Sequence, residues 1–105
     1  MAALLPVQIE NIKNCLQSGG SVQIPSGCID GGWDIYIPFR GQRLNVDDMV
    51  FCVLRLCGGD RRFCASRITR IHLNWWKGRT APWFRIADGW CYERDIYGKL
   101  RPEGH

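Results

Sequence analysis

The chain has 105 residues, a formal net charge of +4, 46% hydrophobic residues and 23% charged residues. A chain of this length typically forms one domain, and its apolar residues suffice for a core, which excludes disordered and low-complexity proteins. We predict a single domain over residues 1–105, with a helix at about 5–17, a β-rich part at about 21–97 and a short C-terminal tail.

The chain has no segment that predicts a membrane span or an export signal. Its longest apolar run, 49–54, stops at Arg55, far short of the about 20 residues that a spanning helix needs. The N-terminal residues carry no basic segment before their short apolar stretch, unlike a secretory signal. We expect a cytoplasmic protein with no membrane partner, and with its six cysteines as free thiols.

The first predicted element is a helix. Its apolar residues follow one another at intervals of four, three and four positions and would share one face: Leu5, Ile9, Ile12 and Leu16. Pro6 suits the first helical turn, and Gly19-Gly20 supplies a stop. We therefore expect one amphipathic helix before residue 20.

Short strands separated by turns are predicted for the rest of the chain, at 21–24, 33–38, 83–86 and 90–93. The stretch 49–57 fits either a short helix, capped by Asn45 and Asp48, or a strand. Its aromatic and β-branched residues favour a strand, which would form a hairpin with 62–73 around the turn 58–60. If that turn centres on residues 60–61, Cys57 lies opposite Cys64.

These elements predict an α+β fold that is mainly antiparallel β. One N-terminal helix would pack on a small, strongly curved sheet or on a partly open barrel of the SH3-like or OB-like type. The sequence Trp75-Trp76-Lys77-Gly78-Arg79 resembles the double-tryptophan strand start of SH3-like barrels, and Trp83-Phe84 follows where such barrels place their next strand. The resemblance implies a small barrel only. The acidic segment and the closing proline-containing segment of that family are missing, so no proline-peptide site is carried over.

The strongest anomaly is a basic block, residues 49–87, with eight basic residues and one acidic residue. Most of its cations are arginine, which can form two parallel hydrogen bonds to a phosphate or a carboxylate. Aromatic residues interleave with them, as in proteins that hold single-stranded nucleic acid. Neighbours on a strand point to opposite faces, so one of the two adjacent tryptophans should be exposed. The predicted binding residues are Arg61, Arg62, Arg67, Arg70, Trp75, Trp76, Lys77, Arg79 and Arg85.

We therefore predict a small non-enzymatic binding protein whose partner is nucleic acid or an acidic protein surface, with nucleic acid favoured. The plainest alternative is that the tryptophans belong to the core and the arginines to a solvated face. Another is an accessory or inhibitor protein, encoded on a phage, plasmid or gene cassette, that docks on a host protein. A third is a small-molecule site in the barrel mouth, lined by Trp33, Tyr36, Trp90 and Tyr92. The oligomeric state stays open, a homodimer included.

Patterns for catalysis and metal binding are weak. His72 alternates with apolar neighbours, as a surface histidine on a strand does, and no spacing ties a cysteine nucleophile to it. Asp47-Asp48 indicates a turn, and no glycine-rich phosphate loop precedes a helix. The paired Cys-x2-Cys spacing of zinc sites is missing, so we expect core-filling cysteines, no metal, no cofactor and no catalytic residue. Any zinc site would use Cys52, Cys57, Cys64 and His72.

Overall fold

The computed structural model describes residues 5–25, 33–76 and 78–102, and the side chains at positions 25, 33, 75, 76, 79 and 80 lie outside this description. Helix α1 (Pro6–Gln17) begins where the Leu5 N–H donates to the Gln8 side chain at 2.8 Å. It ends where the Gly20 N–H donates to the Cys15 carbonyl at 3.0 Å, with Gly19 at a φ of 94° that favours glycine. The helix predicted from the apolar spacing is therefore present.

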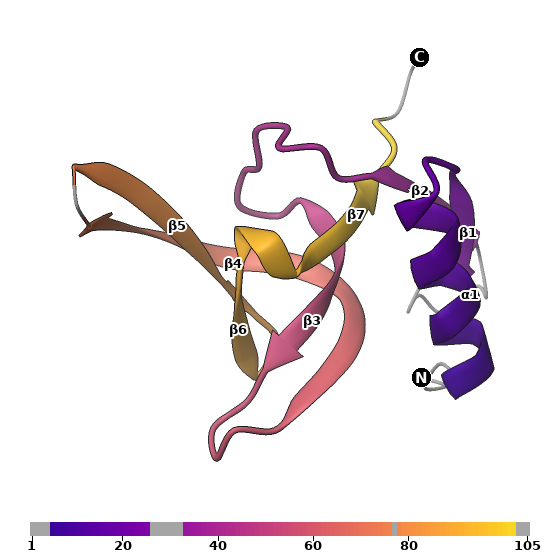
Figure 1. Cartoon of the computed structure of the whole chain (residues 1–105), viewed down its shortest axis with the longest axis horizontal. Helices are drawn as coiled ribbons and strands as arrows, with labels where there is room; N and C mark the ends of the chain where they lie inside the picture. The colour runs from indigo at the N-terminus through magenta and orange to yellow at the C-terminus, as the bar shows by residue number, and fades with distance from the viewer. Residues whose placement is uncertain (1–4, 26–32, 77, 103–105) are drawn as a thin grey trace.

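The described strands form one seven-stranded antiparallel sheet in the order β1-β2-β7-β3-β4-β5-β6, with a further contact between β3 and β6. That contact pairs Arg55 with Trp90 and bends the sheet into a partial ring (Figure 1). The strands are β1 (Val22–Pro25), β2 (Trp33–Pro38), β3 (Met49–Arg55), β4 (Arg61–Trp76), β5 (Arg79–Ile86), β6 (Gly89–Tyr92) and β7 (Ile96–Leu100). A short 3-10 helix, η1 (Glu93–Asp95), connects β6 to β7. The predicted fold class, one helix on a partly open, barrel-like antiparallel sheet, is confirmed.

Two apolar clusters hold the sheet together. The first lies inside the partial ring and contains Val50, Cys52, Leu54, Ile68, Phe84, Ile86, Cys91 and Ile96. The second lies between α1 and the sheet and contains Ile12, Leu16, Ile24, Tyr36 and Phe51. Strand β3 contributes to both clusters, which explains its nearly continuous apolar sequence, since a strand covered on both faces has no solvated side.

The hairpin predicted around residues 58–60 is present, but its predicted register is wrong. Cys64 lies opposite Cys52, and Cys57 is exposed in the turn. Gly58 and Gly59 each adopt a φ of 89°, so the turn forms at the two glycines rather than farther along the chain. Cys57 and Cys64 therefore do not face each other.

The sequence pattern does not predict β7, although it lies in the middle of the sheet between β2 and β3. Its sequence holds Gly98 and Lys99, which weaken the strand pattern. Gly98 is required by packing, because a Cβ atom there would lie 2.8 Å from the Leu16 Cδ1 atom of α1. The close approach of α1 thus requires glycine at position 98, and this glycine weakens the strand pattern in the sequence.

The arrangement in space separates the helix from the longest strands. Figure 1 shows α1 beside β1 and β2, while β4 and β5 extend away from it as a long two-stranded arm. Within the described ranges, neither the length nor the hydropathy of any helix is enough to cross a bilayer. The base of the arm, where β5 also pairs with β6, carries the surface described next.

Candidate binding surface on the outer face of the barrel

The pairing register brings one set of side chains together on the outside of the ring. On β5, Phe84 and Ile86 are buried in the ring, so the alternation of a strand places Trp83 and Arg85 on the outer face. Trp83 lies opposite His72 of β4 on one side and Tyr92 of β6 on the other. Four aromatic side chains thus share this face, and we call them the aromatic platform: His72, Trp83, Trp90 and Tyr92.

The rings of the aromatic platform contact one another in sequence. His72 stacks on Trp83, with ring centroids 3.9 Å apart and planes 9° from parallel. The Trp83 and Trp90 rings meet edge to face at 6.2 Å, and the Trp90 and Tyr92 rings do so at 5.0 Å. Such pairs add to the stabilisation that burial provides, so each ring helps to hold the next in place.

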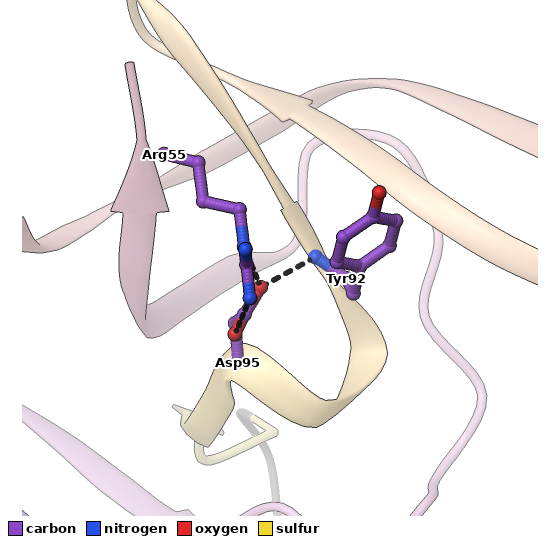
Figure 2. Close-up of polar contacts among 3 residues, drawn as sticks. All are labelled: Arg55, Tyr92 and Asp95. Carbon is purple, nitrogen blue, oxygen red and sulfur yellow. Dashed lines mark hydrogen bonds and ion pairs between the residues drawn. The ribbon is translucent and has the colours of Figure 1, made fainter. Parts of the chain in front are cut away.

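An ion pair supports the platform from the side of β3 (Figure 2). The Arg55 Nε atom donates to Asp95 Oδ2 at 2.8 Å, and its Nη2 atom donates to Asp95 Oδ1 at 3.1 Å. The Tyr92 backbone N–H donates to the same Oδ2 atom at 2.9 Å. The guanidinium lies 5.0 Å from the centre of the Tyr92 ring and 5.8 Å from that of the Trp90 ring, within cation–π range.

Each residue of this ion pair shifts the pKa of the other. Burial by itself raises the pKa of Asp95, but the hydrogen bonds from Arg55 and from the Tyr92 N–H outweigh it, so the pKa lies below its ordinary value. The hydrogen bond with Asp95 in turn raises the pKa of Arg55. The pair stays ionised at neutral pH and fixes the end of β6 and the start of η1.

A groove opens on the platform at the base of the arm. It has a volume of about 270 Å³ and is lined by Asn74, Trp83, Arg85, Trp90 and Tyr92. Asn74 and Arg85 are exposed, and the three aromatic residues are half-buried. Arg94 lies at the edge of the platform, with its guanidinium 4.5 Å from the centre of the Tyr92 ring.

The predicted binding residues divide into three groups. Arg70 lies opposite Arg85 and Arg61 opposite Arg55, so Arg61, Arg70 and Arg85 are on the outer face. Arg62 pairs with Asp88, and the Arg67 Nη1 atom lies 3.9 Å from Asp47 Oδ1, so both have carboxylate partners. The side chains of Trp75, Trp76 and Arg79, and all of Lys77, lie outside the described residues.

Part of this surface was not predicted from the sequence. The pattern around His72 is that of an ordinary edge residue, and no sequence signal pointed to Asn74, Arg94 or Asp95. Of the residues expected to line a barrel mouth, Trp90 and Tyr92 line this groove on the outer face instead, and Tyr36 is buried under α1 and 2% exposed. The side chain of Trp33 lies outside the description. The alternation Trp83-x-Arg85 beside Trp90-x-Tyr92 is the signal that could have identified the outer face.

Three cysteines, Cys52, Cys64 and Cys91, contribute to the core of the ring, whereas Cys57 is exposed and the expectation that it fills the core is wrong. Cys52 and Cys91 are fully buried, and the neighbouring thiols of Cys64 and Cys91, together with burial, raise the pKa of Cys52. A hydrogen bond with Cys52 lowers the pKa of Cys64. The five cysteines in the described ranges are free thiols, and those ranges contain no cluster of three His, Cys, Asp or Glu side chains placed to hold a metal ion.

No protein-family model, no curated protein and no solved structure matches the chain. The function has to be inferred from the geometry and chemistry of the outer face.

Proposed function

We propose that this protein is a non-enzymatic binding protein that holds single-stranded nucleic acid on the aromatic platform. The observation that carries the proposal is the contiguous set of rings on the outer face, with arginines beside them. Proteins that bind single strands combine these two features, because every base has a face that can stack and every nucleotide carries a phosphate.

The aromatic platform favours unpaired bases over a duplex. Bases stacked inside a duplex have no free face for an aromatic side chain, whereas bases of a single strand can stack on one. Trp83 and His72 already show the planar stacking that such a surface needs, with only 9° between their rings. Stacking on protein rings is worth about 1–3 kcal/mol per base, so two occupied positions would give measurable affinity.

The charges beside the platform fit a phosphate backbone. Arg70, Arg85 and Arg94 form no ion pair within the described residues, so their guanidinium groups are available to a ligand. Arg55 is less available because Asp95 holds it with two hydrogen bonds. Three arginine contacts with a single strand predict a fall of log affinity with log salt at a slope of about −2.

Binding of a fluorescent single-stranded oligonucleotide, followed by anisotropy from about 50 to 200 mM salt, tests the proposal. We expect the slope of about −2, and we expect Arg85→Ala to flatten it by about 0.7. Trp83→Ala should weaken binding by about 1–3 kcal/mol while leaving the slope unchanged. Arg40→Ala is the matched control, because it removes the same charge near Gly19 at the end of α1, away from the arm (Figure 1).

The same measurement separates nucleic acid from an acidic protein surface, which the platform could also bind. Poly-glutamate carries charge but no bases, so it should compete poorly with the oligonucleotide. Equal competition, or no binding of single strands at about 50 mM salt, rejects the nucleic-acid proposal. A host-protein target of a protein encoded on a mobile element would then be sought with Trp83→Ala as the negative control.

A cytoplasmic location is part of the proposal. The five described cysteines are unpaired, and thiols persist in a reducing compartment.

A further inference from the structure

The groove borders Trp83. His72 stacks against one face of the Trp83 ring, and His72 is not among the residues that line the groove. On the other side, Trp83 lies opposite Tyr92, which does line the groove together with Trp90. A flat ligand entering the groove would therefore contact Trp83, whose ring is already stacked on His72.

The size of the groove suits one heterocycle. Its volume of about 270 Å³ is just below the about 300–1,000 Å³ of pockets for drug-sized ligands. Trp90 and Tyr92 line the same space, with their ring planes 85° apart. One base of a strand could thus be held here, with its neighbours along the rest of the outer face.

Two polar side chains line the groove, Asn74 from β4 and Arg85 from β5. Because His72 lies opposite Trp83, Asn74 lies two residues farther toward the tip of the arm, while Arg85 lies two residues from Trp83 toward the ring. A carboxamide offers one donor and one acceptor side by side, which adenine matches with its N6 amino group and N7 atom. Arg85 offers the fork of donors that a phosphate accepts.

We infer that this groove is a subsite for one adenine base, which stacks on Trp83, forms paired hydrogen bonds with Asn74 and directs its phosphate toward Arg85. This inference rests on the proposed function and deepens it, since it gives the surface a base preference at one position. Stacking and charge alone would bind every base with similar affinity. Asn74 therefore supplies the preference and Trp83 the affinity.

The first test compares single strands of about ten adenines or ten thymines. We expect the adenine strand to bind about fivefold or more tightly, as one paired contact between an amide and a base provides. Asn74→Ala and Asn74→Asp should abolish the preference, the second because a carboxylate has no donor for N7. Asn74 is exposed, so neither change disturbs the core. Asn74→Ala changes no charge and should keep the salt slope of the unaltered protein.

The second test uses 5′-AMP alone, followed by the NMR signals of the tryptophan indole N–H groups. We expect the Trp83 and Trp90 signals to shift with AMP, and to shift several-fold less with the same concentration of thymidine monophosphate. Arg67→Ala is the control, since Arg67 contacts Asp47 and lines no part of the groove. It should leave both titrations unchanged.

The outcomes distinguish this inference from the proposed function. Binding of both strands with equal affinity, or a preference that survives Asn74→Ala, overturns the adenine subsite and leaves single-strand binding intact. A response to AMP without any binding of oligonucleotides supports the adenine subsite and rejects the proposed binding of single-stranded nucleic acid. No response of the indole signals to millimolar AMP, together with no preference between strands, overturns the subsite.

Discussion

The ion pair between Arg55 and Asp95 is expected to stabilise the fold as well as the aromatic platform. The substitution Asp95→Asn removes the negative charge but keeps an oxygen that can accept the Tyr92 N–H bond. It leaves the Arg55 guanidinium without its carboxylate, in cation–π range of two aromatic rings. The substitution therefore removes the charge pair but can keep the hydrogen bond that joins Asp95 to the end of β6.

The exposure of the pair sets the expected magnitude. The side chains of Arg55 and Asp95 are 18% and 11% exposed, between a surface pair, worth about 0–1 kcal/mol, and a fully buried pair, whose disruption costs about 3–5 kcal/mol. We expect Asp95→Asn to lower the free energy of unfolding by about 2 kcal/mol, with a fall in Tm of about 8–16 °C. Urea denaturation at pH 7 measures the first quantity, and calorimetry measures the second.

The effect should depend on pH in one direction. The folded state lowers the pKa of Asp95 below its ordinary value, so the pair stabilises the protein fully above that ordinary value and loses its contribution as the pH falls through the folded pKa. The difference between the unaltered protein and Asp95→Asn should be constant near neutral pH and shrink below about pH 4.

A matched control is the exposed ion pair of Arg62 and Asp88, whose side chains are 50% and 62% exposed. Asp88→Asn should cost less than about 1 kcal/mol, because solvent screens such pairs. Equal effects of the two substitutions, or a difference for Asp95→Asn that persists into acid, would refute the assignment of a buried, ionised pair.

Two further predictions concern the thiols and the closure of the ring. A thiol reagent should modify exposed Cys57 quickly in the native protein and buried Cys52 only on unfolding, whereas similar rates would contradict the register. Gly89→Ala should destabilise the protein by more than about 2 kcal/mol in urea denaturation, because the new Cβ atom would collide with the Arg55 carbonyl oxygen where β6 meets β3. Ala87→Gly in the same turn should be neutral or slightly stabilising, since Ala87 has a φ of 50°, and a comparable loss there would point to a general effect of the turn.

The local elements of this fold can be predicted from the sequence. The apolar spacing between Leu5 and Leu16 is a property of one short segment, and so is the glycine stop that follows it. The same holds for the strand alternation at 33–38 and for the turn at 87–89. Each pattern needs only neighbours along the chain, which is why the helix, these strands and the hairpins with turns at 58–60 and 87–89 could be predicted, whereas the hairpin of β4 and β5 was not.

The pairing of distant segments depended on the tertiary structure. The Arg55–Asp95 pair joins residues 40 positions apart, and β7 enters the centre of the sheet from the end of the chain. The place of β7 beside β3 depends on the burial of both faces of β3, which no local pattern encodes. Cys64 lies opposite Cys52 and not opposite Cys57, because the turn forms at Gly58 and Gly59. That cause is local, but the strand register that it produces is seen only in the folded sheet.

The composition of the candidate site was set by the sequence, and its shape by the fold. The excess of arginine and tryptophan in residues 49–87 is visible in the sequence alone. In the fold, Arg62 and Arg67 lie near carboxylate partners. Arg70 and Arg85 lie opposite each other on β4 and β5, beside the aromatic platform. Tyr36 and Trp83 have equally apolar neighbours in the sequence. Tyr36 is nevertheless buried beneath α1, whereas Trp83 lies on the outer face, because α1 packs over the part of the sheet that contains Tyr36.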